Sequence, residues 1–181
     1  MELHVDTVDV AAVVRHVVDT SGTLAAAGGN HLRVDGLETL GTIQSDAVKL
    51  QQVLLNLVGN ACKFTSQGRV HVGCRREPGQ PTDWVVIDVT DTGIGMTPEQ
   101  ITRLFGQFMQ ADSSMTRRFG GTGLGLAISQ QLSAMLGGAI TVRSEFGGGS
   151  VFTVRVPACA PHAAITAGPT GVSAPANRPV D

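Results

Sequence analysis

Two glycine clusters separated by a polar stretch are the feature of this sequence that most restricts its fold. The first is Asp91-Thr92-Gly93-Ile94-Gly95-Met96, and the second is Gly120-Gly121-Thr122-Gly123-Leu124-Gly125-Leu126. Glycine lets a backbone approach a ligand closely, and a glycine-rich loop that runs into a helix directs free N–H groups at an anion. The order of the clusters predicts a nucleotide site in which Asp91 reads a base and the second cluster holds phosphates under a mobile lid.

Overall composition indicates one folded domain and argues against two kinds of nucleic-acid binder. The chain has 181 residues, of which 42 % are apolar, enough for a domain with its own core. A net charge of −2 does not suit binding that relies on overall positive charge. With no Tyr and one Trp, the chain also lacks platforms for stacking bases. Three cysteines without CxxC spacing suit a reducing compartment.

The two ends of the sequence carry no targeting or membrane signal. Residues 1–6 do not resemble a signal peptide, and no apolar run is long enough to cross a membrane. We therefore expect a cytoplasmic segment without membrane contact of its own, whether or not a longer parent protein is attached to a membrane. From Pro157 the composition shifts to Ala, Pro, Gly and Thr, so we expect one domain over 1–156 and a disordered tail or linker over 157–181.

Apolar residues at helical spacing predict three main helices. They run from Val8 to about Ala27, from Ser45-Asp46 to about Phe64, and from about Leu124 to Leu136. Either Ser45 or Asp46 can cap the second helix. A short fourth helix is expected to start at Thr97-Pro98 and to end near Leu104, with Thr97 as its N-cap.

Alternating or β-branched segments predict seven strands. They cover residues 3–6, 31–35, 39–43, 69–74, 83–89, 139–143 and 150–156. The second and third lie around a turn at Gly36, the fourth and fifth form a hairpin, and the last two form a hairpin over Gly147–Gly149. The predicted fold class is α+β: a two-layer sandwich with a mixed, mostly antiparallel sheet and three main helices on one face.

The second helix presents two carboxamides and an ammonium from an otherwise apolar surface. Asn56 and Asn60 lie four residues apart and share a face, and Lys63 follows on nearly the same side. This combination suits a Mg²⁺–phosphate group, because Mg²⁺ takes few protein ligands and leaves the rest to phosphates and water. One isolated Asn would indicate only a solvated stripe, and Asp91 alone would indicate only a turn. The two glycine clusters favour the functional interpretation of both.

Two common nucleotide motifs do not explain the second glycine cluster. A Rossmann fingerprint needs a βαβ unit and an acidic residue about 20 positions on, and neither surrounds Thr122-Gly-Leu-Gly-Leu126. A P-loop needs Gly-Lys-Ser/Thr, which is also missing.

Five segments together resemble the boxes of sensor histidine kinases. Gln52–Thr65 resembles their N box, Asp91–Met96 the G1 box, Phe105–Phe108 the F box, Gly121–Leu126 the G2 box, and Gly147–Phe152 a glycine-rich final motif. The stretch from Gln110 to Gly121 is similar to the lid of hybrid histidine kinases. The resemblance covers about residues 1–156 and implies the Bergerat fold of the gyrase, chaperone and histidine-kinase superfamily, with ATP and Mg²⁺ as cofactors.

The resemblance also implies roles by position. Asn60 would bind Mg²⁺, Asn56 would assist near the phosphates, Lys63 would contact phosphate and Asp91 would bind adenine N6; Arg117 or Arg118 would contact the γ-phosphate from the lid. Around the nucleotide it places Gly93, Ile94, Gly95, Met96, Phe108, Gly121, Thr122, Gly123, Leu124, Gly125, Leu126 and Ser150. The chain departs from the family at Gly106-Gln107, where Glu-Pro is common, and at Gln110, where some relatives carry Arg.

Phosphoryl transfer is favoured over ATP hydrolysis. Relatives that hydrolyse ATP carry Glu one turn before the metal Asn, whereas this chain has Asn56, which is no general base near neutral pH. The resemblance implies an acceptor His that is followed by Glu or Asp, and none of the five His in this chain fits that pattern. We therefore expect two-component signalling in which a monomeric catalytic domain phosphorylates a histidine on another segment or chain, with a response regulator downstream. The alternatives are a serine/threonine kinase of the anti-sigma type and a non-catalytic ATP-binding module.

Overall fold

Four α-helices lie within the described residues, and all four were predicted. The computed structural model describes residues 3–105 and 124–159. Within them, α1 spans Val10–Ala27, α2 spans Ala47–Phe64, α3 spans Pro98–Phe105 and α5 spans Leu124–Met135. None of these described helices is long and apolar enough to cross a membrane.

Five strands form the main sheet in the order β2-β4-β5-β7-β6. Their bounds are β2 His31–Asp35, β4 Arg69–Glu77, β5 Trp84–Asp91, β6 Ala139–Glu145 and β7 Gly149–Pro157. The two predicted hairpins, β4–β5 and β6–β7, are confirmed as antiparallel pairs. Only β2, which pairs with β4, runs parallel to its neighbour. The sheet is therefore mixed and mostly antiparallel, as predicted.

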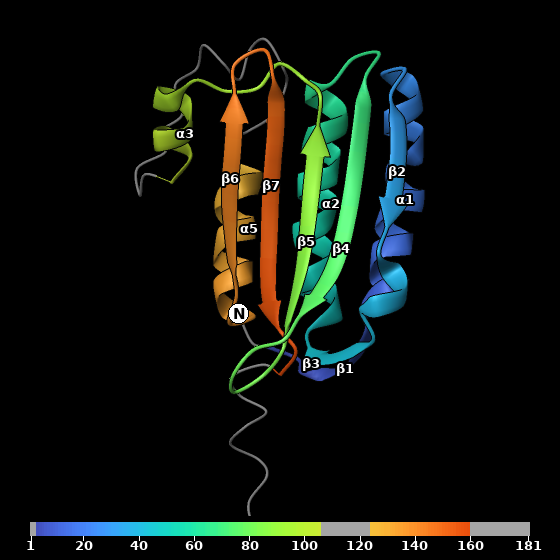
Figure 1. The fold of residues 1–181 in the computed structure, drawn as a ribbon, viewed down its shortest axis with the longest axis vertical. Helices are drawn as coiled ribbons and strands as arrows, with labels where there is room; N and C mark the ends of the chain where they lie inside the picture. Colours follow the sequence, from blue (N-terminus) through green and yellow to red (C-terminus); the bar gives the residue numbers. More distant parts are fainter. Residues whose placement is uncertain (1–2, 106–123, 160–181) are drawn as a thin grey trace, which may run out of the picture.

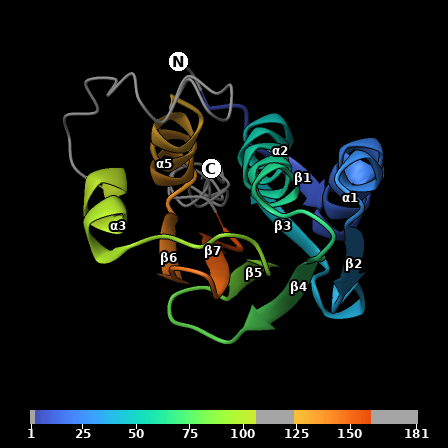
Figure 2. The same ribbon diagram turned by 90° about the horizontal axis from the view of Figure 1, so that it is seen from above.

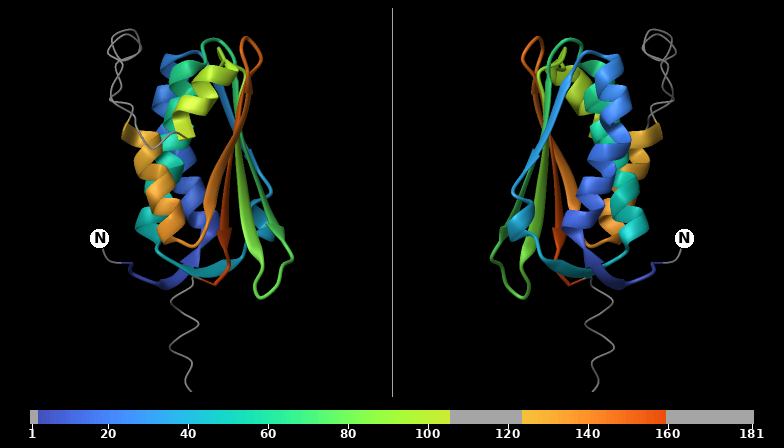
Figure 3. Two further views of the ribbon diagram at one scale, coloured as in Figure 1. Left: turned by 90° about the vertical axis from the view of Figure 1, so that its left-hand side faces the viewer. Right: turned by 90° about the vertical axis from the view of Figure 1, so that its right-hand side faces the viewer.

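The helices cover one face of this sheet and leave the other open. In Figure 2 the main helices lie on the same side of the strands, and in Figure 3 the two layers are seen edge-on. Period-two alternation places Val85, Ile87 and Val89 of β5 against the helices, where they are essentially inaccessible to solvent. The helical period places Leu50, Leu54 and Leu57 of α2 opposite them. The core thus lies between α2 and the central strands.

The segment after Gly36 differs from the prediction. Instead of a strand over 39–43, a single 3₁₀ turn spans Leu37–Thr39 and strand β3 spans Thr42–Ser45. β3 pairs with β1, Asp6–Asp9, in a separate two-stranded sheet and not with β2. The residue pattern did not reveal these partners, because pairing of short strands is decided by contacts distant in sequence. The first strand likewise begins at Asp6 instead of residue 3.

Gly36 explains how the chain turns sharply out of the main sheet after β2. Its φ is 76°, and a Cβ at this position would lie 1.8 Å from the carbonyl oxygen of Cys74 on β4. Only glycine allows both this left-handed backbone and this close approach. The chain can therefore turn under β4 toward β3, which leads into α2.

Asp46, not Ser45, caps α2. The Oδ1 atom of Asp46 accepts a hydrogen bond from the Lys49 amide at 3.0 Å, and its Oδ2 atom lies 2.6 Å from Lys49 Nζ. Burial opposes ionisation of Asp46, but hydrogen bonds from Lys49 and His4 outweigh it and hold the pKa of Asp46 below its ordinary value. Thr97 caps α3 as predicted, with its Oγ1 accepting from the Gln100 amide at 3.3 Å.

The folded part continues past the predicted boundary at residue 156. β7 ends at Pro157, the Ala158 amide donates to the carbonyl of Asp83, and the Gln44 amide donates to the carbonyl of Ala158. Ala158 therefore joins β3 to the residue that precedes β5. Cys159 forms an isolated parallel bridge with Gln44, and the predicted tail lies outside the described residues from residue 160.

Candidate functional site

The polar face of α2 contacts the first turns of α5. The Asn56 Nδ2 atom donates to Ser129 Oγ of α5 at 2.9 Å, and Ser129 is 1 % exposed. Asn60 is half-buried one turn further along α2, and its side chain makes no hydrogen bond to any described residue. Lys63 is exposed in the last turn, with Nζ 5.7 Å from the Phe64 ring centroid. The two predicted asparagines therefore differ. The side chain of Asn56 is fixed by its hydrogen bond to Ser129, whereas the side chain of Asn60 can still bond to a ligand.

Gly125 makes room for Asn56. A Cβ at Gly125 would lie 2.3 Å from Asn56 Oδ1, closer than non-bonded atoms approach. Because the φ of Gly125 is not in the left-handed region, the reason for glycine here is space for a neighbouring side chain. The start of α5 therefore packs directly on the asparagine face of α2.

Asp91 ends β5 as a buried carboxylate. It is 6 % exposed, and its Oδ1 atom accepts from the Gly93 amide at 2.8 Å, with Thr65 Oγ1 at 3.5 Å. Burial raises the pKa of Asp91, although hydrogen bonds from Gly93, Ser150 and Thr65 act in the opposite direction. The carboxylate is thus fixed in orientation and poorly solvated, which strengthens its interaction with a donor on a ligand.

The first glycine cluster runs between the end of α2 and the β6–β7 turn. The Ile94 amide donates to the Phe64 carbonyl at 3.3 Å, and the Ile94 carbonyl accepts from the Gly147 amide at 2.7 Å. A Cβ at Gly93 would lie 2.3 Å from the Phe64 carbonyl oxygen, and one at Gly95, where φ is 63°, would lie 1.8 Å from that of Glu145. These two glycines therefore let the loop pass against two other backbones, and this contact holds it in place.

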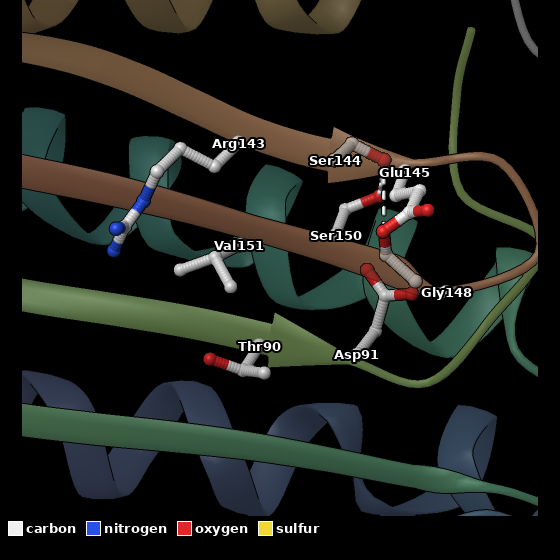
Figure 4. Close-up of a pocket in the computed structure, with 9 residues that line it drawn as sticks. Thr90, Asp91, Arg143, Ser144, Glu145, Gly148, Ser150 and Val151 are labelled. Carbon is white, nitrogen blue, oxygen red and sulfur yellow. Dashed lines mark hydrogen bonds between the residues drawn. The ribbon is translucent and has the colours of Figure 1, made fainter.

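The strand ends beside Asp91 form a shallow depression of about 340 Å³ (Figure 4). Ser144 of β6 and Ser150 of β7 lie next to Asp91, with their hydroxyl oxygens 2.9 Å apart, and Ser144 Oγ also accepts from the Met96 amide at 2.9 Å. Neither asparagine lines this depression. It therefore lies at the rim of the sheet, where its lining also includes Thr90, Val151 and Arg143 of the open face, while α2 and α5 carry the asparagines on the helix side.

Asn30 supports the site from a distance and was missed by the sequence analysis. Its Nδ2 atom donates to the carbonyls of Cys62 and Thr65 at 3.0 and 2.8 Å, and its Oδ1 atom accepts from the Gly68 amide at 3.0 Å. These bonds tie the end of α1 to the turn after α2, which carries Thr65 beside Asp91. A buried Asn between a helix-ending Gly-Gly pair and a strand is the only signal that the sequence offers for this role.

Other predicted site residues fall into three groups. Leu126 is buried in the core, Ile94 is 46 % exposed, and Met96 is half-buried. The side chain of Leu124 is not described. Outside the described residues lie Phe108, Arg117, Arg118, Gly121, Thr122 and Gly123.

Mg²⁺ is compatible with the donors that are present. Within residues 3–105 and 124–159, no three His, Cys, Asp or Glu side chains gather into a group that could hold a metal. Mg²⁺ bound together with phosphates does not need such a group, because the phosphates and water supply most of its ligands. Asn60, with a carboxamide that no described residue engages, suits the remaining position.

These features are those of an α+β domain with a buried carboxylate at the end of β5 and an asparagine face on α2. Comparison with known families agrees. Residues 45–160 match the family described as histidine kinase-, DNA gyrase B-, and HSP90-like ATPase. Because the match covers more than half of the sequence, the chain belongs to this family of ATP-binding domains.

Relatives place it on the histidine-kinase side of the family. The autoinducer 2 sensor kinase/phosphatase LuxQ of Vibrio cholerae is 43 % identical over 121 residues, 67 % of this chain and 14 % of LuxQ. The sensor histidine kinase RcsC of Escherichia coli K12 is 44 % identical over 115 residues, 64 % of this chain and 12 % of RcsC. The chain thus spans about one eighth of the length of these relatives.

Solved structures show the same fold. Full-length ShkA in complex with AMPPNP aligns with a TM-score of 0.72 at 35 % identity, over 87 % of this chain and 32 % of ShkA. The catalytic domain of histidine kinase ThkA aligns with a TM-score of 0.68 at 21 % identity, over 88 % of this chain and 99 % of that domain. The predicted fold class is confirmed as that of histidine-kinase catalytic domains.

Proposed function

We propose that this domain binds Mg²⁺-ATP and transfers the γ-phosphoryl group to a histidine on a separate phosphoacceptor domain. The observation that carries the proposal is the convergence of three elements: the asparagine face of α2, the start of α5 that Gly125 lets pack on it, and the buried Asp91 at the end of β5. The first two suit phosphates and the third suits a base, at the two ends of one nucleotide.

In this proposal Asp91 accepts a hydrogen bond from the adenine N6 amine. Its Oδ1 atom is already oriented by the Gly93 amide, so little entropy is lost when the base binds. The low solvent exposure of Asp91 excludes competing water. The first glycine cluster, held between α2 and the β6–β7 turn, then forms a fixed wall beside the base.

Asn60 would hold Mg²⁺ together with the phosphates, and the bound ion would neutralise charge that develops on the transferred group. Asn56 is oriented by Ser129, so that its Oδ1 atom faces the start of α5. Lys63, exposed one turn beyond Asn60, would contact phosphate. These residues position the phosphates, which is most of what phosphoryl transfer requires of a protein.

Transfer to an acceptor is favoured over hydrolysis because α2 has no carboxylate. Its residues, Ala47–Phe64, include neither Asp nor Glu. A water molecule near the phosphates would therefore find no general base on this helix. A histidine acceptor brings its own nucleophilic nitrogen, so the proposed partners are a phosphoacceptor domain and, after it, a response regulator in the cytoplasm.

The proposal is tested by incubating the chain with radiolabelled ATP and a phosphoacceptor domain, for example that of RcsC, and following the label. We expect acid-labile phosphate on that domain, abolished by Asn60→Ala and retained by Gly22→Ala, a change in α1 where an added Cβ meets nothing within 4 Å. Acid-stable phosphate would indicate a serine/threonine kinase instead. ATP binding without any transfer would indicate a regulatory module.

A further inference from the structure

The open face of the main sheet divides its charges unevenly. Figure 1 shows this face toward the viewer, with the helices behind it. By strand alternation five arginines point outward from it, and all are exposed. They are Arg33 on β2, Arg69 and Arg75 on β4, Arg143 on β6 and Arg155 on β7.

At the end of the sheet remote from Asp91, the arginines are neutralised. Arg75 pairs with Glu77 at 2.9 Å and with Asp88. Arg155 lies 3.6 Å from Glu77 and stacks on Trp84, 4.5 Å from the ring centroid. These side chains are therefore already engaged within the domain.

At the end near Asp91, the arginines are not neutralised. Arg33, Arg69 and Arg143 form no ion pair among the described residues. Asp35 and Asp88, which lie in the same register on this face, are engaged by His71 at 2.7 Å and by Arg75, respectively. Glu145 is the other acidic residue on this half. A local excess of positive charge thus lies on a chain whose net charge is −2.

The strand register aligns these groups in a row. Arg33 pairs with His71, His71 with Thr90, Thr90 with Val151 and Val151 with Arg143, so the row crosses all five strands. Figure 4 shows Arg143, Val151 and Thr90 along its β6 side. A depression of about 340 Å³ opens at the other side, and it meets the depression beside Asp91 at Thr90. Its walls include His31, Arg33, Arg69 and His71.

The length of the row determines what can bind it. Four interstrand spacings separate Arg33 from Arg143, roughly 19 Å. One phosphate or carboxylate cannot contact both guanidinium groups at this separation, whereas a polypeptide with several spaced carboxylates can. Arginine also suits carboxylate pairing, because its planar fork binds both oxygens.

We infer that this row, from Arg33 through His71, Thr90 and Val151 to Arg143 with Arg69 beside it, is a docking surface for an acidic polypeptide segment of a partner protein. The row lies on the opposite side of the sheet from α2 and α5, and it meets the nucleotide site only at the rim beside Asp91. Partner docking and ATP binding can therefore be measured separately.

The test is an NMR titration of the isotope-labelled chain with a peptide of alternating glutamate and threonine, beside its glutamine-for-glutamate counterpart. We expect the acidic peptide to shift the amide signals of His71, Thr90 and Val151. Its binding should weaken as the salt concentration rises, and the affinity for the ATP analogue should stay unchanged. The glutamine peptide should shift none of them. No shift along the row with the acidic peptide would overturn the inference.

Charge-reversal variants distinguish binding at this surface from nonspecific attraction between the peptide and any positive charge on the chain. Arg33→Glu and Arg69→Glu should each weaken peptide binding about tenfold, since each loses an ion pair and adds repulsion. Arg15→Glu, the same charge change on the exposed face of α1, should not. Equal losses in all three variants would contradict the inference. So would inorganic phosphate that shifts the same signals with equal affinity, because that result would indicate a small-anion site.

Discussion

In the proposed site, Asp91 serves ATP binding at the expense of the stability of the folded chain. Its burial raises its pKa, so the ionised form is less favourable in the folded chain than in the unfolded chain. A raised carboxyl pKa means that stability increases as the pH falls through the folded-state pKa toward the ordinary value of 3.8. Binding of adenine should change in the opposite direction, because protonation removes the acceptor.

The variant Asp91→Asn is expected to raise the free energy of unfolding near neutral pH and to weaken ATP binding about 10- to 150-fold, the equivalent of losing one hydrogen bond to a charged group. Urea unfolding and nucleotide titration of the same samples check both parts. In the wild type, ATP affinity should decline as the pH is lowered toward the raised pKa. A variant that is less stable and still binds ATP normally would contradict this account of Asp91.

Gly125 is the second residue whose role is specific enough to test. Gly125→Ala places a Cβ 2.3 Å from the present position of Asn56 Oδ1, so Asn56 or the start of α5 must move. We expect phosphotransfer to fall about 10- to 100-fold, as misplaced reacting groups typically cause. The matched control is Gly22→Ala, which should keep full activity and gain about 0.5–1 kcal/mol of stability in α1. Wild-type transfer by Gly125→Ala would show that the contact is unimportant.

At the scale of elements, α2 and α5 are joined by the Asn56–Ser129 hydrogen bond. Ser129→Ala should reduce the rate of phosphotransfer about 2- to 12-fold, the range for one net hydrogen bond of 0.5–1.5 kcal/mol, with little effect on the KM for ATP. Ser133→Ala is the control on the same helix, because the Ser133 hydroxyl is buried without a partner among the described residues. Steady-state kinetics of both variants test this. If Ser129→Ala transfers phosphate as fast as Ser133→Ala does, Ser129 does not position Asn56.

The turn after α2 depends on Asn30. Asn30→Ala leaves the Cys62 and Thr65 carbonyls and the Gly68 amide without their partner, and we expect a loss of roughly 3 kcal/mol or more in the free energy of unfolding. Asn30→Asp keeps the acceptor for Gly68 but loses both donors, so it should also destabilise. Denaturant unfolding measures each loss. A change below about 0.5 kcal/mol in both variants would mean that water replaces these bonds.

Helices and hairpins were predictable because their signals are local. The apolar period of α2, its acidic cap and the glycine turn between β6 and β7 all lie within short windows of sequence. The pairing of β1 with β3 and the parallel pairing of β2 with β4 join segments more distant in the chain, and no local pattern records them. Gly36, which the sequence analysis placed in a simple turn, is glycine because it passes against Cys74.

In the candidate site, the sequence singles out the residues that carry their own chemistry and not those that support them. Asn56, Asn60 and Asp91 stand out by residue type, spacing and neighbouring glycines. Ser129 contacts Asn56 from α5, and Asn30 holds the turn that carries Thr65 beside Asp91. Both lie far along the chain from their partners, and Ser or Asn at such positions has no distinctive pattern. Their roles follow only from the packing.

On the scale of the whole molecule, the sheet separates two surfaces. The helix-covered side carries the asparagines and the hydrophobic core, and the open side carries the row from Arg33 to Arg143. Asp91 and Thr90, consecutive residues of β5, contribute to opposite sides, as strand alternation requires. A partner on the open side would therefore leave α2 and α5 accessible to ATP.

Calorimetric titration with a non-hydrolysable ATP analogue, with and without Mg²⁺, tests the central claim that α2, α5 and the end of β5 form one Mg²⁺-ATP site. We predict a single site that tightens with Mg²⁺ and is weakened by Asp91→Asn. The effect of Mg²⁺ should disappear in Asn60→Ala, and Gly22→Ala should bind like the wild type. Binding that is absent from the wild type, or that is indifferent to Asp91 and Asn60, would contradict the account.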